Sequence, residues 1–283
     1  MLSKFIEVNG IRLHYVEEGT GDLVILLHGF PEFWYGWRKQ IPVLGQHYRV
    51  VAPDMRGYNL SDKPKGIAQY KMDVLAKDIA ELIKQLGNGK VILVGHDWGA
   101  AVSWAVAAIY PELISRLVIL NVPHQAEMRK ALLGFNVAQW AKSYYMFLFQ
   151  LPRIPEWFIG RDLAKTFRNT FASFSSKGTA PPDDEIQEYV KAYSQPGALT
   201  ATINYYRAAL RDMKGTAESE ILQMPVLMIW GEQDKALGKE LTYNTKDHCA
   251  DLEIIYDPTS GHFIQSDNPE LVNSKLLEFF AKN

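Results

Sequence analysis

The stretch Val91-Ile-Leu-Val-Gly-His-Asp-Trp-Gly99 decides how this chain should fold. Its first four residues form a continuous apolar run, typical of a strand buried on both faces, and the residues from Trp98 onward predict a helix. Gly95 and Gly99 flank Asp97 with the Gly-x-nucleophile-x-Gly spacing of a nucleophile elbow, the sharp strand-to-helix turn that presents a reactive side chain. Asp97 could instead be an ordinary helix N-cap, a role that aspartate fills well.

Strands and helices alternate on both sides of this stretch. Apolar runs predict strands at Leu23–Leu27, Tyr48–Ala52, Val91–Val94, Arg116–Leu120, Val226–Trp230 and Leu252–Tyr256. Apolar spacing predicts a helix over Met72–Leu86, and a last helix begins at Pro269. The chain opens with a hairpin turning at Asn9-Gly10. Alternation of this kind predicts an α/β protein with a mostly parallel sheet and an antiparallel start.

The alternation stops between residues 125 and 216, where only helices are expected. The helical stretches are Phe135–Phe149, Trp157–Phe171, Asp184–Tyr193 and Leu199–Asp212. An all-helical insert in a parallel-sheet protein is typical of a lid. We therefore predict a core domain made of residues 1–124 and 217–283, and a helical cap made of residues 125–216.

Three further features support a nucleophilic role for the elbow aspartate. A His-Gly loop closes an early strand, so the amide of Phe30 is expected to form an oxyanion hole together with that of Trp98. Asp234 follows a strand end and is the candidate acid, although Glu232 lies two residues away and could exchange roles with it. His262 follows the next strand and is the candidate base, which gives the order nucleophile, acid, histidine.

The remaining histidines have simpler interpretations. His28 and His96 belong to the two loops just described and are expected to be structural hydrogen-bonding groups. His14, His47, His124 and His248 lack the position after a strand in the right chain order. The alternative acid position of this arrangement, after the strand that ends at Leu120, holds Asn121 and is therefore empty.

An aspartate nucleophile predicts attack on a saturated carbon. Serine would form an ether with an alkyl substrate, whereas a carboxylate forms an ester that activated water can hydrolyse. A carboxylate is also ionised at neutral pH and needs no base for the first step. Asp97 therefore favours epoxides or alkyl halides over ordinary esters.

The sequences of residues 28–37 (His-Gly-Phe-Pro-Glu-Phe-Trp-Tyr-Gly-Trp), 54–58 (Asp-Met-Arg-Gly-Tyr) and 95–101 (Gly-His-Asp-Trp-Gly-Ala-Ala) closely resemble those of the soluble epoxide hydrolases. The resemblance covers essentially the whole chain and implies an α/β-hydrolase fold with an eight-stranded sheet. It also implies a cis bond between Phe30 and Pro31. Asn59 stands where relatives often carry a second glycine, and asparagine tolerates the left-handed backbone expected there.

The same resemblance implies two cap tyrosines that donate a proton to the epoxide oxygen. The motif Asn204-Tyr-Tyr-Arg207 points to Tyr206, and Tyr145-Met-Phe-Leu-Phe-Gln150 points to Tyr145. Tyrosine can stabilise the basic leaving oxygen without being ionised at neutral pH. Both tyrosines could instead be core aromatics, and Tyr144 and Tyr205 are adjacent competitors.

The expected substrate is a small apolar epoxide, which reacts with water and needs no metal or other cofactor. Five aromatic residues are candidates for contacts with it: Phe33, Trp34, Trp98, Trp140 and Phe147. A haloalkane dehalogenase would share the nucleophile and the base, but it needs two side-chain N–H donors for the halide, and Phe30 offers none. A non-catalytic ligand-binding protein of the same fold is the other alternative.

Composition narrows the partners and the compartment. The chain of 283 residues is 47% hydrophobic and has a net charge of −2, so it lacks the basic surplus expected for binding nucleic acid or a membrane. Its single cysteine, Cys249, excludes an intrachain disulfide, and its N-terminus has no apolar run of signal-peptide length. These features favour the cytoplasm. The most hydrophobic run, Phe135 to Leu151, suits a buried or interfacial helix rather than a membrane span.

Overall fold

Eight strands form one sheet in the computed structural model, which describes the chain except for residues 88, 135–136, 143, 213–220 and 283. The strands are β1 (Leu2–Val8), β2 (Ile11–Glu18), β3 (Leu23–Leu27), β4 (Arg49–Pro53), β5 (Val91–His96), β6 (Ile114–Leu120), β7 (Val226–Gly231) and β8 (Leu252–Asp257). Their order is β1-β2-β4-β3-β5-β6-β7-β8. The pairs β1–β2 and β2–β4 are antiparallel and the others parallel, so the predicted fold class is confirmed.

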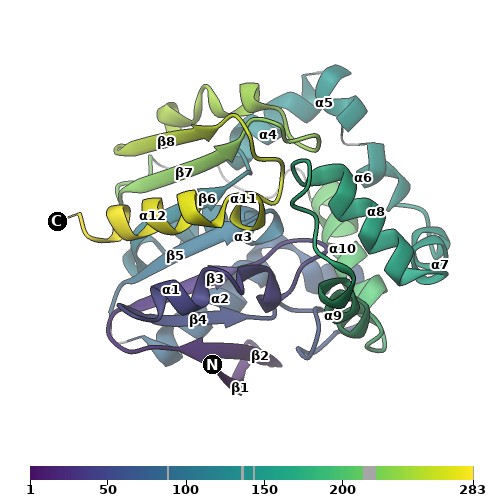
Figure 1. The fold of residues 1–283 in the computed structure, drawn as a ribbon, viewed down its shortest axis with the longest axis horizontal. Helices are drawn as coiled ribbons and strands as arrows, with labels where there is room; N and C mark the ends of the chain where they lie inside the picture. Colours follow the sequence, from purple (N-terminus) through teal and green to yellow (C-terminus); the bar gives the residue numbers. More distant parts are fainter. Residues whose placement is uncertain (88, 135–136, 143, 213–220, 283) are drawn as a thin grey trace.

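Helices cover both faces of this sheet. The core helices are α1 (Ile41–Leu44), α2 (Met72–Leu86), α3 (Trp98–Ile109), α11 (Ile264–Asp267) and α12 (Pro269–Phe280). Figure 1 shows α1 and α12 in front of the sheet. Within β3, Leu23, Ile25 and Leu27 belong to one apolar core, and Val24 and Leu26 belong to the core on the opposite face. Burial on both faces explains why this strand is a continuous apolar run instead of an alternating one.

Seven helices lie between β6 and β7 along the described chain. They are α4 (Gln125–Leu133), α5 (Val137–Lys142), α6 (Tyr144–Leu148), α7 (Ile154–Gly160), α8 (Leu163–Phe174), α9 (Asp183–Tyr193) and α10 (Ala198–Arg211). Figure 1 shows α6 to α10 gathered beside the sheet, on the right of that view. The division into a core and a cap at residues 124/125 stays a prediction. The second predicted boundary, at 216/217, falls outside the described residues.

One helical expectation in this region differs from the structure. Residues 157–171 were expected to form one helix, but α7 ends at Gly160 and α8 begins at Leu163. Asp162 causes the interruption, because its carboxylate accepts a hydrogen bond from the amide of Lys165 at 2.9 Å and caps α8. Within the expected helix 135–149 the structure describes α5 and α6, and residues 135, 136 and 143 lie outside the described residues.

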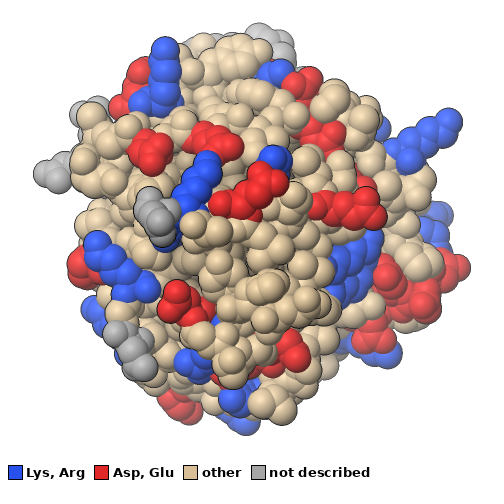
Figure 2. All heavy atoms as spheres, turned by 60° about the vertical axis from the view of Figure 1, so that its left-hand side comes forward, with Lys and Arg blue, Asp and Glu red and all other residues tan. Residues whose placement is uncertain are grey.

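The surface on one face mixes charges of both signs. Figure 2 shows Lys and Arg interspersed with Asp and Glu over that face, without a large area of one sign. No helix in the described ranges is both long and apolar enough to cross a membrane.

Short 3-10 turns complete the fold at η1 (Trp34–Trp37), η2 (Ile67–Tyr70), η3 (Pro111–Leu113), η4 (Lys239–Thr242) and η5 (Thr245–His248).

Candidate active site

Asp97 occupies a strained turn between β5 and α3. Its φ of +48° and ψ of −120° are rare for a residue with a side chain. Close packing holds the turn in place. A side chain at Gly99 would place its Cβ 2.2 Å from the Leu27 carbonyl oxygen, and one at Gly29 would lie 2.2 Å from the Cβ of Asp97. The two glycines are thus needed for close approach, and the carboxylate of Asp97 projects from a fixed position.

The three residues expected to form a catalytic triad lie together at the carboxyl ends of β5, β7 and β8. Nε2 of His262 is 3.5 Å from Oδ2 of Asp97, and Nδ1 of the same ring is 2.7 Å from Oδ2 of Asp234. The amide of His262 donates to the Phe174 carbonyl oxygen at 2.8 Å, which fixes the backbone below the ring. The side chains therefore lie next to one another in the order nucleophile, base and group that orients the base.

Asp234 is held by several donors. Its Oδ1 accepts hydrogen bonds from the amides of Ala236 and Leu237, at 2.7 and 3.0 Å. Its Oδ2 accepts one from Nδ2 of Asn121 at 2.7 Å. Burial raises the pKa of Asp234, but the charge of His262 and these hydrogen bonds outweigh it and leave the pKa below its ordinary value. Glu232, the alternative acid, pairs instead with Lys239 at the surface.

The charges of Asp97 and His262 stabilise each other. Burial disfavours the charged form of both side chains, yet the net pKa shift favours the charged form in both cases. The hydrogen bond and charge of His262 hold the pKa of Asp97 below its ordinary value. Asp234 and Asp97 together raise the pKa of His262 well above its ordinary value. Both shifts favour a resting site in which an Asp97 carboxylate faces a His262 imidazolium.

The backbone at Phe30 faces the Asp97 carboxylate. Its amide donates to Oδ1 of Asp97 at 2.6 Å, and the Phe30–Pro31 bond is cis, as the resemblance implied. Trp98 is the first residue of α3, and the first amides of a helix have no partner within the helix. Both amides expected to form an oxyanion hole thus belong to residues beside the carboxylate.

His28 and His96 have the structural contacts expected for them. Nε2 of His28 accepts a hydrogen bond from the amide of Met55 at 3.0 Å. The ring of His96 lies between Glu32, at 2.8 Å, and the carbonyl oxygen of His262, at 2.8 Å. These bonds tie the loop after β3 and the elbow to the loop that carries the candidate base.

The structure distinguishes between the adjacent cap tyrosines. Tyr145 on α6 and Tyr206 on α10 line one cavity with Asp97, and their ring centroids are 5.8 Å apart. Tyr144 is 62% exposed, and the hydroxyl of Tyr205 donates to the carbonyl oxygen of Arg56 at 2.7 Å. Burial, followed by the charge of Asp97, raises the pKa of both Tyr145 and Tyr206. Both phenols therefore keep their protons at neutral pH.

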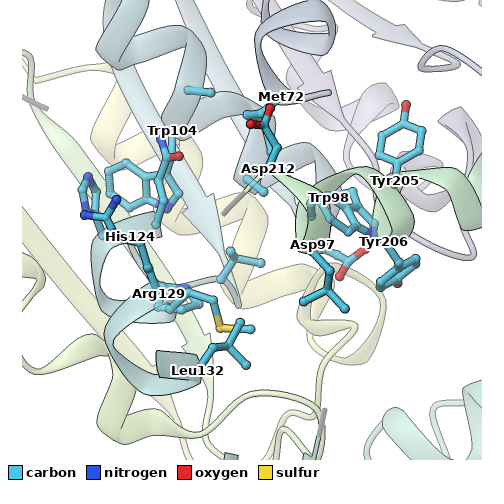
Figure 3. A pocket seen from close by; sticks show the side chains of 18 of the residues that line it. Met72, Asp97, Trp98, Trp104, His124, Arg129, Leu132, Tyr205, Tyr206 and Asp212 are labelled. Carbon is cyan, nitrogen blue, oxygen red and sulfur yellow. The ribbon is translucent and has the colours of Figure 1, made fainter. Parts of the chain in front are cut away.

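The cavity has a volume of about 690 Å³ and extends well beyond Asp97 along α3. Figure 3 shows Asp97, Trp98, Tyr205 and Tyr206 at one end and Trp104, His124 and Arg129 at the other. Apolar and aromatic side chains dominate its wall, and Leu132 and Met146 close it on the side of α4 and α6. Its shape and lining suit an elongated apolar molecule whose reactive end lies at the carboxylate.

Of the five aromatic residues expected to contact substrate, the structure places only Trp98 on the cavity wall. Phe33 is buried against the ring of Tyr189, with 5.5 Å between centroids, and Trp34 packs against Phe33. Trp140 and Phe147 are 38% and 42% exposed, with 5.5 Å between their ring centroids. For Trp140 on α5 and Phe147 on α6, aromatic character alone does not indicate whether the side chain points toward the cavity or toward solvent.

Sequence reasoning missed several supporting residues. The sequence marks Asn121 only as an empty acid position. In the structure it has a φ of +49°, donates to Asp234 and accepts from the amide of Gly231 at 2.9 Å. Its place directly after a strand end was the available signal. Arg207 of the tyrosine motif bonds the carbonyl oxygens of Phe149 and Leu151, which ties α10 to the segment after α6. No group in the described part of the chain has three ligands arranged for a metal ion.

Comparisons with known proteins agree with this geometry. Residues 22–269 match the alpha/beta hydrolase fold family. An "AB hydrolase superfamily protein YfhM" of Bacillus subtilis is 42% identical over 98% of this chain and 96% of its own. Epoxide hydrolase 4 of Mus musculus is 37% identical over 98% of this chain and 78% of its own. A Bacillus megaterium epoxide hydrolase solved with an inhibitor superposes with a TM-score of 0.89 and 34% identity, over 99% of this chain and 100% of that one.

Proposed function

The chain belongs to the epoxide hydrolases of the α/β-hydrolase fold, and we propose that it opens a small apolar epoxide to a vicinal diol through a covalent ester on Asp97. One observation carries the proposal. The Asp97 carboxylate lies 3.5 Å from His262 and shares its cavity with Tyr145 and Tyr206, whose phenols keep their protons. A nucleophile, a base and two acids thus meet where a substrate can enter.

The first half-reaction uses the charge of Asp97. One carboxylate oxygen attacks a ring carbon of the epoxide, and the carbon–oxygen bond of the ring breaks as the ester bond forms. The released oxygen takes a proton from Tyr145 or Tyr206. Because both phenols are neutral, they can donate a hydrogen bond to the oxygen as its charge develops.

The second half-reaction uses the imidazole. His262 removes a proton from water, which attacks the Cγ carbon of the esterified Asp97. The negative oxygen of the tetrahedral intermediate accepts hydrogen bonds from the amides of Phe30 and Trp98. The bond between Cγ and the diol oxygen then breaks, the diol oxygen takes the proton of the hydroxyl group that water added, and the carboxylate is restored.

Ester formation also prepares His262 for this role. In the resting site Asp97 helps to raise the pKa of the imidazole. The ester carries no charge, so its formation lowers that pKa and favours loss of the imidazole proton. The imidazolium proton replaces the one that the tyrosine gave to the released oxygen, which leaves a neutral imidazole and a neutral phenol. His262 becomes a free base only after the nucleophile has reacted.

A single turnover in ¹⁸O-water, with enzyme in excess over a styrene-type epoxide, tests the covalent route. If Asp97 is the nucleophile, its own oxygen enters the first diol, because water attacks the ester carbonyl and not the alkyl carbon. We expect mostly unlabelled diol and label in the Asp97 side chain. Many turnovers in the same solvent serve as the control and should give labelled diol.

Labelled diol from the first turnover would show that Asp97 acts as a general base for water. That result would reject the ester while leaving the epoxide hydrolase activity in place. Haloalkanes assayed beside the epoxide test the dehalogenase alternative, and we expect no halide release.

A further inference from the structure

The outer edge of the cap carries an unusual amount of exposed apolar surface. In the described part of the chain, nine of the sixteen exposed large apolar side chains fall within residues 133–158. They are Leu133, Trp140, Tyr144, Phe147, Leu148, Leu151, Ile154, Trp157 and Phe158, and we call them the cap apolar band. Their exposed fractions run from 38% to 63%. Clusters of this kind mark interaction surfaces, whereas single exposed apolar residues do not.

The band starts at the end of α4 and continues along the three successive helices α5, α6 and α7. Figure 1 places α5, α6 and α7 along the outer edge of the cap, away from the sheet. Ring contacts join parts of it, with centroid distances of 5.5 Å for Trp140 and Phe147 and 5.0 Å for Trp157 and Phe158. The same short α6 presents Tyr145 and Met146 to the substrate cavity and Tyr144 and Phe147 to the outside. One helix therefore separates the band from the cavity.

Basic side chains border the band. Lys142, Arg153, Arg161 and Lys165 lie within or beside it, and among the described residues none of them forms an ion pair with an acid. Two acids occur in the same stretch, but Glu156 is paired with Arg207, and Asp162 caps α8. The local charge is therefore positive although the net charge of the chain is −2.

A hollow of about 460 Å³ lies at one end of the band. Phe158, Arg161, Asp162, Lys165, Thr166 and Asn169 line it. Arg161 also lies over the ring of Trp157, with its guanidinium carbon 4.6 Å from the ring centroid. Exposed aromatic rings thus stand beside two cations, two uncharged hydrogen-bonding side chains and one carboxylate, that of Asp162, which accepts a hydrogen bond from the Lys165 amide. This combination suits an anionic phosphate headgroup with its acyl chain against the rings.

We propose that the cap apolar band docks the protein onto the surface of an anionic lipid bilayer. Tryptophan, tyrosine and phenylalanine with flanking lysine and arginine are the composition that favours a membrane–water interface. A second copy of the chain fits less well, because a two-fold interface would bring the same cationic borders together. The net charge of the whole chain, −2, disfavours a membrane partner, but it does not reveal the local excess of basic side chains beside the band.

Docking at this edge would bring the substrate cavity close to the phase in which apolar epoxides concentrate. The proposal does not depend on the reaction, because the band contains neither the triad nor the two cap tyrosines on the cavity wall. It also requires no membrane-spanning helix, since such a surface rests in the headgroup region.

Flotation with lipid vesicles tests docking, in the absence of any epoxide. We expect the protein to float with vesicles containing one quarter phosphatidylglycerol, and to bind pure phosphatidylcholine vesicles at least tenfold more weakly. The double variant Trp157→Ala/Phe158→Ala should lose binding at least tenfold. Arg161→Gln/Lys165→Gln should lose about 30-fold on the anionic vesicles, from roughly fivefold for each basic residue near such a surface.

Leu2→Ala/Tyr243→Ala is the matched control, because these side chains are 62% and 60% exposed but lie outside the band. It should bind as the unchanged protein does. All variants should retain turnover of a water-soluble epoxide in vesicle-free buffer, which shows that they fold. Failure of the unchanged protein to float at low salt, or equal binding by Trp157→Ala/Phe158→Ala, would overturn the proposal. So would a dimer in sedimentation that this variant abolishes, since the band would then join two copies.

Discussion

The core and the cap contribute opposite kinds of group to the candidate site. From the ends of three strands come Asp97, Asp234 and His262, whose charges are held by short hydrogen bonds to neighbouring backbone and side chains. From α6 and α10 come Tyr145 and Tyr206, whose burial keeps them neutral. In the proposed mechanism, the strand ends therefore provide the charged groups and the helices α6 and α10 provide the proton donors.

If the proposed mechanism holds, this difference assigns the two regions to different steps. Ring opening needs a nucleophile and an acid, so it requires the core and the cap together. Ester hydrolysis needs a base, water and the oxyanion amides, and all of these protein groups belong to the core. Variants of the two regions should therefore stop the reaction at different points, and the following experiments test that separation.

The largest effect is expected for His262→Gln. Without the base, turnover should fall by about 10⁴-fold or more. Ring opening should continue, because Asp97 needs no base to attack, so intact-mass spectrometry should show protein heavier by one substrate with the adduct on Asp97. His47→Gln, at an exposed histidine far from the triad in sequence, should turn over normally. An unmodified His262→Gln protein would contradict the assignment.

Loss of either cap tyrosine should slow the earlier step. Tyr206→Phe and Tyr145→Phe should each reduce the rate of ring opening by about 10–10³-fold, which corresponds to about 1.4–4 kcal/mol. The double change should nearly abolish it. The rate of hydrolysis of an ester already formed should not change in any of these variants.

Tyr205→Phe provides a control on the same helix, because its hydroxyl already donates to the Arg56 carbonyl oxygen. It should leave ring opening within about threefold of normal, although it removes a buried hydrogen bond worth about 1 kcal/mol of stability. If Tyr205→Phe stopped ring opening and Tyr206→Phe did not, the motif would have been aligned one residue off.

The sequence predicted the core more completely than the cap, for a physical reason. At Asp97, Asp234 and His262 a strand end fixes where the next residues lie, so order and spacing along the chain are informative. Cap helices carry no such constraint. The rings of Trp140 and Phe147 look like cavity residues by composition, yet they are exposed, because the short helices α5 and α6 turn them outward.

Capping shows the same limit at a smaller scale. The break between α7 and α8 depends on one carboxylate, Asp162, which competes with continued helix by bonding the Lys165 amide. His124 caps α4 through its ring nitrogen, which accepts from the amide of Ala126 at 3.3 Å, and histidine is not among the usual capping residues. Neither outcome follows from apolar periodicity.

His124 lies where the chain passes from β6 into α4, so it tests the junction between the two regions. Burial, followed by the charge of His248, lowers its pKa to about 4, and its ring stacks on that of His248 at 4.1 Å. A neutral buried histidine stabilises the fold fully above its unfolded pKa of about 6.5, and this contribution is lost as the pH falls toward 4. The unfolded state binds the proton first.

His124→Asn should therefore flatten the pH dependence of stability, because asparagine can still accept from the Ala126 amide but cannot be protonated. Between pH 7 and pH 4 the unchanged protein should lose up to about 3 kcal/mol more unfolding free energy than the variant. Urea denaturation across this pH range measures the difference. Parallel curves for the two proteins would show that His124 titrates normally.

The smallest effect is expected at the ion pair between Arg38 and Glu185, which joins the loop after η1 to α9. The two side chains are 11% and 22% exposed, so solvent screens their attraction in part. Glu185→Gln should lower the unfolding free energy by about 0.2–1 kcal/mol, and less in 1 M salt. Arg38 keeps its contact over the Tyr35 ring, at 4.7 Å, and its hydrogen bond to the Tyr35 carbonyl oxygen, so its position should persist.

Glu188→Gln is the control for that change, because Glu188 lies on the same helix and pairs with Lys191 within it, both well exposed. Its effect on the unfolding free energy should stay within about 0.5 kcal/mol, whether unfolding is followed in the core or in the cap. Neither variant should alter ring opening or ester hydrolysis, since apolar packing places α9 and the tyrosine helices. Suppose instead that Glu185→Gln slowed ring opening as the tyrosine changes do, while ester hydrolysis stayed normal. The position of the cap would then depend on a charge supplied by the core, and the two regions would not be separable at this contact.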